Sequence, residues 1–208
     1  MKKFLSAVFI STAMLVNSAA AEKIPAAPAE DLPEMTLAEN SEGNDTKRNF
    51  EIQLDYLQGR LGSDRQVDNY NVHLMQKMHE HRALTFYRGL TFSRATGYTN
   101  RNLEGILRDS NAVGIGVAGM FRWKRHVSGK FYMNWDLSGS FLLYNRAHPA
   151  QGRAYGFLWR TGPSFTWNYR DDDSFTVGYY VSHVSNGMKS HNPGYNTMGF
   201  SLGVNHKF

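Results

Sequence analysis

The sequence predicts an all-β protein, an eight-stranded antiparallel transmembrane β-barrel. Three observations predict this fold class. From Asn49 to Phe208, apolar and aromatic residues alternate with polar or small ones, which is the period-two pattern of strands with one apolar face. The chain begins with a secretory signal, so it is exported. Aromatic residues make up 13% of the chain, and Trp and Tyr lie near strand ends, as the interfacial girdle of a membrane barrel requires.

Residues 1–21 have the features of a secretory signal peptide. Two lysines precede the apolar run Phe4–Val16, and the small residues Ala19–Ala21 form a cleavage site. The apolar run is shorter than the roughly 20 residues that a transmembrane helix needs. We therefore expect a mature chain that begins at Glu22.

The mature chain divides at Asn49. Residues 22–48 contain three prolines and seven acidic residues but no aromatic residue, so they cannot bury enough apolar surface to fold alone. We expect them to form a flexible periplasmic arm. In residues 49–208, aromatic residues occur throughout and apolar residues alternate with polar ones. We expect these residues to form one outer-membrane barrel domain.

Alternation divides the barrel domain into eight strands. Alternation alone would also suit a soluble sandwich or a lipocalin-like barrel. The residues between the apolar ones are polar or small, which fits the narrow lumen of a membrane barrel. Every backbone polar group in lipid must be paired, so strands in a membrane have to close into a barrel. The expected strands are Phe50–Tyr56, Tyr70–Leu74, Leu84–Phe92, Val113–Trp123, Phe131–Leu143, Tyr155–Tyr169, Phe175–Ser185 and Met198–Phe208.

The charge balance excludes nucleic acid as a partner. The chain has 23 basic and 18 acidic residues, and removal of the two signal-peptide lysines leaves 21 against 18, a net charge of +3. The basic residues form no helix or stripe that could follow a phosphate backbone. Arg101, Arg108 and Lys189 lie in loops between expected strands, where they would meet anionic lipid headgroups or remain ordinary solvated charges.

We expect no metal and no cofactor. The chain has no cysteine, which removes disulfides and thiolate ligands. The histidines in His79–His81 lack further ligands nearby. Residues Gly114–Gly119 match G-x-G-x-x-G, but strand alternation continues through Trp123, where a dinucleotide fingerprint would have to open a helix.

A His-x-Ser-Asn cluster ends the strand Phe175–Ser185. His183 and Ser185 share the apolar parity of this strand, so in a membrane barrel both face lipid, and an imidazole can reach a hydroxyl two residues away. His183 can act as base to Ser185, and Asn196 has outward parity on the last strand and can orient the imidazole. Asn186 and Gly187 could bind the developing oxyanion. By spacing alone, the same cluster could be a polar rim without catalysis.

With these residues the chain resembles the lipid A 3-O-deacylase (PagL-like) family of outer-membrane hydrolases. The resemblance depends on HVSNG at His183–Gly187, on Asn192–Gly194 and on a terminal strand that ends in an aromatic residue. It implies an eight-stranded barrel in the outer membrane that hydrolyses the ester-linked 3-hydroxyacyl chain at the 3-position of lipid A, with His183 as base and Ser185 as nucleophile.

The chain departs from the family pattern at the third triad position. A glutamate is expected there, whereas Asn196 is the nearest equivalent, with an interval one residue shorter. A neutral amide can orient His183 but stabilises imidazolium less than a carboxylate does. Outer-membrane phospholipase A similarly pairs His-x-Ser with asparagine, but it is a twelve-stranded barrel, for which the 160 residues of this domain are too few.

The expected partners are lipid A or lipopolysaccharide and the outer membrane itself. An even number of strands and a periplasmic arm place both termini in the periplasm, so His183, Ser185 and Asn196 would lie at the outer leaflet, where lipid A is found. A structural barrel without catalysis and a phospholipase with the same residues remain alternatives. The sequence also leaves a homodimer open.

Overall fold

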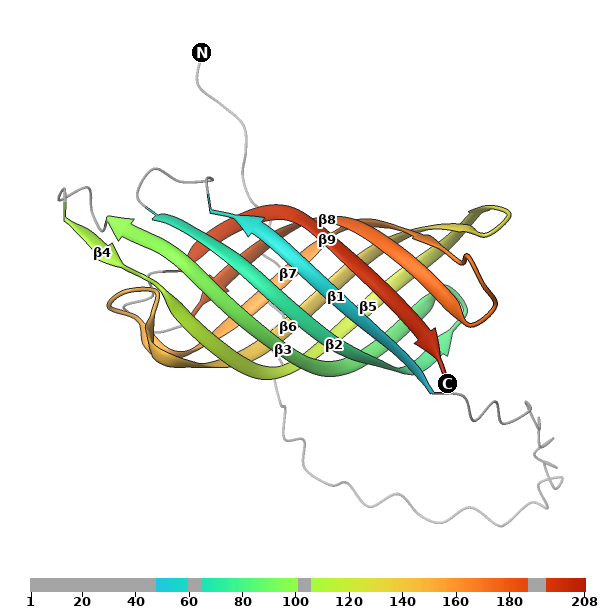
Figure 1. Ribbon diagram of the computed structural model, residues 1–208, viewed down its shortest axis with the longest axis horizontal. Coiled ribbons are helices and arrows are strands. Elements are labelled where there is room, and N and C mark those ends of the chain that lie inside the picture. Colours follow the sequence, from blue (N-terminus) through green and yellow to red (C-terminus); the bar gives the residue numbers. More distant parts are fainter. Residues whose placement is uncertain (1–47, 60–64, 101–105, 187–193) are drawn as a thin grey trace, which may run out of the picture. The chain divides into compact units, whose positions relative to one another are not determined.

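The computed structural model describes residues 48–59, 65–100, 106–186 and 194–208, and these form nine β-strands (Figure 1). The expected signal peptide and all of the expected arm except Arg48 lie outside the described residues. The strands are β1 (Asn49–Gln58), β2 (Arg65–His81), β3 (Leu84–Asn100), β4 (Leu107–Asp109), β5 (Ala112–Ser128), β6 (Phe131–His148), β7 (Arg153–Trp167), β8 (Asp173–Ser185) and β9 (Tyr195–Lys207).

The eight long strands close into an antiparallel barrel. Each pairs with its neighbour in the order β1-β2-β3-β5-β6-β7-β8-β9, and β9 pairs back onto β1. The predicted eight-stranded barrel is therefore confirmed, with one addition. β4 pairs only with β3, and its three residues are too few to show an alternating pattern. All eight predicted strands lie within the observed ones, except that β7 ends at Trp167 and β9 at Lys207, before the predicted limits of Tyr169 and Phe208.

The two ends of the barrel differ. Asn49 pairs with Lys207, so β1 begins where β9 ends, and short turns join β2 to β3, β5 to β6 and β7 to β8 at this end (Figure 1). We call it the turn end. The other end, which we call the loop end, carries the longer connections that follow β1, β3 and β8. Long external loops and short periplasmic turns are the usual asymmetry of outer-membrane barrels.

The outer surface of the barrel is an apolar belt. Along every long strand, exposed residues alternate with buried ones, and the exposed set consists mainly of aromatic and aliphatic side chains. Trp123, Trp167 and Phe208 lie toward the turn end, with 43%, 47% and 71% of their surface exposed. Side chains of this size would not be left open to water in such numbers, so the belt faces lipid. Within the described residues no helix is long and apolar enough to cross a membrane.

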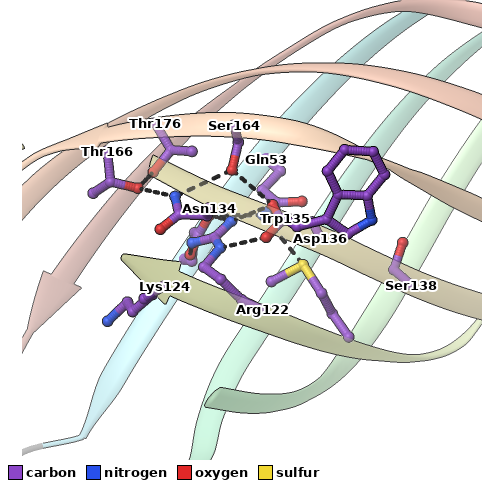
Figure 2. Close-up of polar contacts among 12 residues, drawn as sticks. Gln53, Arg122, Lys124, Asn134, Trp135, Asp136, Ser138, Ser164, Thr166 and Thr176 are labelled. Carbon is purple, nitrogen blue, oxygen red and sulfur yellow. Dashed lines mark hydrogen bonds and ion pairs between the residues drawn. The ribbon is translucent and has the colours of Figure 1, made fainter. Parts of the chain in front are cut away.

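The middle of the lumen is filled by hydrogen-bonded charges. Arg122 contacts both carboxylate oxygens of Asp136, at 2.8 and 2.9 Å (Figure 2). It also contacts both carboxylate oxygens of Glu51, at 2.8 and 3.0 Å. Arg160 donates to Asp55, Gln53 and the Ser138 hydroxyl. Because these groups are almost fully buried, their mutual pairing is what makes the charges tolerable in the lumen.

The lumen near the loop end is apolar instead. Inward side chains from seven strands form one cluster there, and they pack directly behind the wall that carries His183 on its outer face. The cluster contains Val67, Ala95, Ala112, Leu142, Tyr144, Leu158, Val184 and Tyr195. The last two strands are thus packed from inside and leave only their outward residues for binding.

Candidate active site

β8 and β9 bring His183 and Asn196 together at the loop end. The two residues are direct cross-strand partners, and both belong to the outward parity of their strands. On β8 this parity includes the exposed Val177, Tyr179 and Val181, while Ser182 and Val184 on either side of His183 are buried. The structure therefore places His183 and Asn196 on the lipid-facing surface, as the alternation predicts.

A short hydrogen bond joins the two side chains. His183 Nδ1 lies 2.6 Å from Asn196 Oδ1. An amide oxygen only accepts, so Nδ1 is the donor, and a neutral imidazole then has its unprotonated lone pair on Nε2. Nε2 is the nitrogen that a general base would present to a neighbouring hydroxyl.

Ser185 lies on the same face, two residues beyond His183. That spacing on a strand corresponds to a Cα separation of about 6.6 Å, which lets the imidazole and hydroxyl approach. Ser185 pairs with Phe157 of β7 and is half-buried, as is His183. The three predicted catalytic residues therefore lie on the same outer face of the barrel, at its loop end.

Of the two predicted oxyanion residues, Asn186 and Gly187, the structure describes only Asn186. Asn186 follows Ser185 directly, and its side chain is buried, with 2% exposed. It packs against the β6–β7 turn so closely that a Cβ added to Gly152 would be 2.7 Å from Asn186 Nδ2. The side chain does not share the outward face of Ser185, so a backbone N–H is the better oxyanion donor here. Gly187 lies outside the described residues.

Two neighbours of His183 were not predicted from the sequence. Trp159 of β7 is the cross-strand partner of His183, with ring centroids 5.8 Å apart. On the other side, a Cβ added to Gly194 would lie 3.2 Å from His183 Nε2, and the Gly194 carbonyl accepts a hydrogen bond from Arg65. Both contacts depend on strand register, which alternation does not reveal.

An inward set of polar residues supports the start of β9. Tyr195 precedes Asn196 and points into the lumen, where its hydroxyl lies 2.8 Å from His148 Nε2 and donates to Asn69 Oδ1 at 2.8 Å. His148 Nδ1 lies 2.9 Å from the Ser110 carbonyl oxygen. The residue next to Asn196 is thereby tied to β2 and to the last residue of β6. The parity of Tyr195 could have suggested its inward direction, but not these partners.

The remaining sequence signals give no second site among the residues that the structure describes. His79 and His81 lie at the end of β2, and Glu80 between them forms ion pairs with Lys77 and Lys124. Among the residues that the structure describes, no group of three or more His, Asp or Glu could hold a metal. The residues of the G-x-G-x-x-G match lie inside β5. Of the loop cations, Arg108 belongs to β4, whereas Arg101 and Lys189 lie outside the described residues.

A protein-family model and one crystal structure agree with this architecture. The family model described as lipid A 3-O-deacylase (PagL) matches residues 68–205. The crystal structure of the outer membrane enzyme PagL is similar at a TM-score of 0.51 and 14% identity, over 76% of this chain and 98% of that one. The similarity to the crystal structure of Neisserial surface protein A covers 78% of this chain and 96% of that one, at 11% identity and a TM-score of 0.45. No curated protein sequence matches.

Proposed function

This chain belongs to the lipid A 3-O-deacylase (PagL) family, and from that premise we propose that it cleaves its ester by serine catalysis with Ser185, His183 and Asn196. Family membership makes the chain a carboxylic ester hydrolase of lipid A, and an integral outer-membrane barrel. The predicted enzyme class and location are therefore confirmed. The observation that carries the catalytic proposal is the 2.6 Å contact between His183 and Asn196, on the face that they share with Ser185.

In the first half of the reaction, Ser185 Oγ attacks the carbonyl carbon of the ester at the 3-position of lipid A. His183 Nε2 takes the hydroxyl proton as the Oγ–C bond forms. The carbonyl oxygen becomes an oxyanion, for which the backbone amides of Asn186 and Gly187 are the proposed donors. When the tetrahedral intermediate collapses, the sugar oxygen leaves and receives the proton from His183.

In the second half, water attacks the acyl group on Ser185. His183 takes one proton from the water and returns it to Ser185 Oγ, which releases a 3-hydroxy fatty acid and restores the enzyme. Asn196 holds the Nδ1–H in both halves, which keeps the lone pair on Nε2. Since Asn196 is neutral, it orients the imidazole without adding a charge that would stabilise imidazolium.

The proposed location of the site is the outer leaflet. Asn196 is the second residue of β9 from the loop end, and Ser185 is the last residue of β8 before a loop-end connection. If the turn end is periplasmic, both lie at the external surface, where lipid A is concentrated. Most phospholipid lies in the other leaflet, so this location favours lipid A over a phospholipase reaction.

The serine mechanism is tested by a pair of serines on one strand. Ser185→Ala should abolish deacylation, measured by mass spectrometry of lipid A from cells that produce each variant. Ser182→Ala, three residues earlier and buried on the inward side, is the matched control and should deacylate normally. Full activity of Ser185→Ala would remove the serine mechanism. Release of fatty acid from phosphatidylethanolamine, with lipid A unchanged, would favour the phospholipase instead.

The location is tested by single cysteines at two connections. Ser190→Cys lies in the sequence between β8 and β9, and Asp171→Cys lies in the exposed turn between β7 and β8. A membrane-impermeant thiol reagent added to whole cells should label the first and spare the second. The reverse pattern would place the catalytic residues at the periplasmic surface.

A further inference from the structure

An arginine interrupts the apolar belt on the side of the barrel opposite the proposed active site. Arg88 has the outward parity of β3 and is exposed, between the outward Phe86 and Leu90. β3 is four strands away from β8 in either direction around the barrel, so Arg88 and His183 lie on opposite walls. The group that Arg88 contacts is therefore separate from the ester that Ser185 attacks.

Arg88 lies within the belt but near the turn end. It is four residues beyond Leu84, the first residue of β3, and Leu84 pairs with Trp123, one of the large aromatic residues at the turn end. Four residues rise about 13 Å along a strand, and strand tilt reduces this to about 10 Å along the barrel axis. An arginine at this depth can turn its guanidinium to the nearer membrane surface while its stem stays in the apolar region. That surface is the one at the turn end.

The guanidinium of Arg88 is unpaired within the described part of the barrel. Neither a hydrogen bond nor an ion pair joins Arg88 to any of the described residues. The nearest outward residues on the neighbouring strands β2 and β5 include no acid; they are Leu74, Gln76, Val117 and Gly119. A charged side chain on a lipid-facing surface is costly, and ionisable residues within membrane segments are usually paired or functional. An anion from outside the barrel is the partner that this cation lacks.

Gln76 adds a second donor beside Arg88. The two residues are direct cross-strand partners on β2 and β3, and both face outward. The Cβ atoms of such partners lie about 4.5–5.5 Å apart, so a guanidinium and an amide N–H can reach the same group. A guanidinium donates to two oxygens of a phosphate in parallel, and a neutral amide donates to a third position without adding charge. The pair is thus suited to a phosphate group.

An apolar hollow continues from these two donors along the outer wall. Its volume is about 700 Å³, and ligand sites commonly measure about 300–1,000 Å³. Arg88 and Gln76 line it together with outward apolar side chains from β1, β2, β3 and β5. The apolar residues on its loop-end side are Ile52, Leu74, Leu90 and Val117. The hollow therefore has its donors toward the turn end and its apolar part toward the middle of the bilayer, as an amphipathic ligand requires.

We propose that Arg88, Gln76 and this hollow bind a glycerophospholipid of the periplasmic leaflet. Its phosphate lies against the two donors, and one of its acyl chains lies in the hollow and points to the middle of the bilayer. The choice of leaflet takes the turn end to be periplasmic, as the proposed location of the active site does. Lipid A also carries phosphates, but it is concentrated in the opposite leaflet, at the level of Asn196. The phospholipid is thus a bound lipid on a second site and not a substrate.

The phosphate contact supplies the preference for this lipid. The surrounding lipid chains are as apolar as the walls of the hollow, so exchange of one chain for another changes little free energy. A charge-assisted hydrogen bond from Arg88 is available to a phospholipid and not to a diacylglycerol with the same chains. Removal of the guanidinium should therefore weaken binding of the phospholipid and leave binding of the diacylglycerol unchanged.

The test measures lipid binding by native mass spectrometry of the full-length barrel in detergent, with dioleoylphosphatidylglycerol and dioleoylglycerol as probes. The two probes have the same chains and differ in the phosphate-containing headgroup. The unaltered protein should bind the phospholipid at least about tenfold more tightly than dioleoylglycerol, and Arg88→Leu should lose this preference. Arg94→Leu is the matched control, because Arg94 is an exposed, outward arginine of the same strand, six residues nearer the loop end. It should keep the preference of the unaltered protein.

Three results would overturn the phospholipid site. The first is an unchanged preference in Arg88→Leu. The second is an equal loss in Arg94→Leu, because binding would then depend on charge in general. The third is displacement of the lipid by millimolar inorganic phosphate, which would assign the two donors to a free anion. If Arg88→Leu changes only the ratio of dimer to monomer, the wall is a contact between two copies of the chain and the proposal is wrong.

Two further variants separate the parts of the proposal. Val117→Trp fills the hollow and should weaken binding of both probes, and unchanged binding would mean that no acyl chain lies there. Ser185→Ala should bind both probes as the unaltered protein does, because the site is on the opposite wall. Failure of the phospholipid site would therefore leave serine catalysis standing, and loss of the serine mechanism would leave this site unaffected.

Discussion

Two histidines on opposite sides of the barrel wall have similar hydrogen-bonded neighbours. On the outer face, His183 contacts Asn196 at 2.6 Å and lies beside Ser185. In the lumen, His73 Nε2 lies 2.9 Å from Asp55 Oδ2, and its Nδ1 lies 2.8 Å from the Thr91 hydroxyl. By contacts alone, the lumen set is nearer to a complete set of hydroxyl, imidazole and carboxylate.

The difference between them is access. His73 is fully buried with both ring nitrogens engaged, and the Thr91 hydroxyl is also 2.8 Å from Ser140 Oγ. No ester can reach such a set, so its hydrogen bonds stabilise the fold. His183 has one ring nitrogen held by Asn196 and lies partly exposed on the lipid-facing surface. Access from the membrane therefore indicates chemistry better than a complete hydrogen-bond network does.

Removing each histidine gives the largest expected contrast. His183→Ala should lower lipid A deacylation by roughly 10⁴-fold or more, with unchanged stability. His73→Ala should leave the activity of the folded protein unchanged but destabilise it by about 3 kcal/mol, because buried hydroxyl and carboxylate groups lose a partner. Deacylation per folded molecule and urea unfolding in detergent measure the two effects. Equal losses of activity in both variants would contradict the distinction.

The second contrast concerns Arg122. Arg122→Met leaves the buried Glu51 and Asp136 without their cation and should destabilise the barrel by about 3–5 kcal/mol. Val117→Met on the outward face of the same strand should change stability by less than about 0.5 kcal/mol. Both are measured by urea unfolding. If Arg122→Met were as stable as the unaltered barrel, the lumen network would not be a stabilising element.

Substitution of Asn196, on the outer face, should have a smaller effect on the deacylation rate. Asn196→Ala should lower the deacylation rate by about 10²-fold, less than loss of His183, because it affects only the orientation of the base. Asn196→Asp should retain or raise the rate, since a carboxylate both orients and stabilises imidazolium. Initial rates of both variants on lipid A in detergent measure this. A rate for Asn196→Asp below that of Asn196→Ala would mean that Asn196 does not hold the imidazole.

The smallest expected effect concerns Tyr195, whose inward side chain supports the outward Asn196. Tyr195→Phe removes the contacts with His148 and Asn69 behind Asn196, and we expect kcat to fall by less than about tenfold with KM unchanged. Tyr180→Phe, which removes an inward hydroxyl bound to Asp136 at 2.5 Å, is the control and should leave kcat unchanged. If both variants had the same kcat, support from the lumen would not influence the site.

Alternation was enough to predict the barrel and the faces of its residues. His183, Ser185 and Asn196 could be placed on one surface because side chains on a strand alternate strictly between two faces. The same rule, applied to Asn186, would have predicted that its side chain points away from Ser185. β4 could not be predicted, since three residues show no period.

Strand register was the information that the sequence did not reveal. The pairing of Trp159 with His183, the pairing of Gly139 with Gly119, and the contact of Arg122 with Glu51 each join residues from different strands. A shift of two residues in one strand would keep every side chain on its predicted face and still remove these contacts. The surroundings of His183 and the charged network of the lumen are therefore properties of the assembled barrel.

The filled lumen has a consequence for the cell that contains this enzyme. At the turn end, a hollow of about 280 Å³ enters the barrel and reaches Glu51 and Arg122. Beyond this hollow, the interior is occupied first by Arg122 and Arg160 with their carboxylate partners, and then by the apolar cluster around Leu142. Almost none of the surface of these residues is exposed. Ions and small solutes thus meet a packed core instead of a pore. We therefore expect the folded barrel to pass neither ions nor small solutes across the outer membrane.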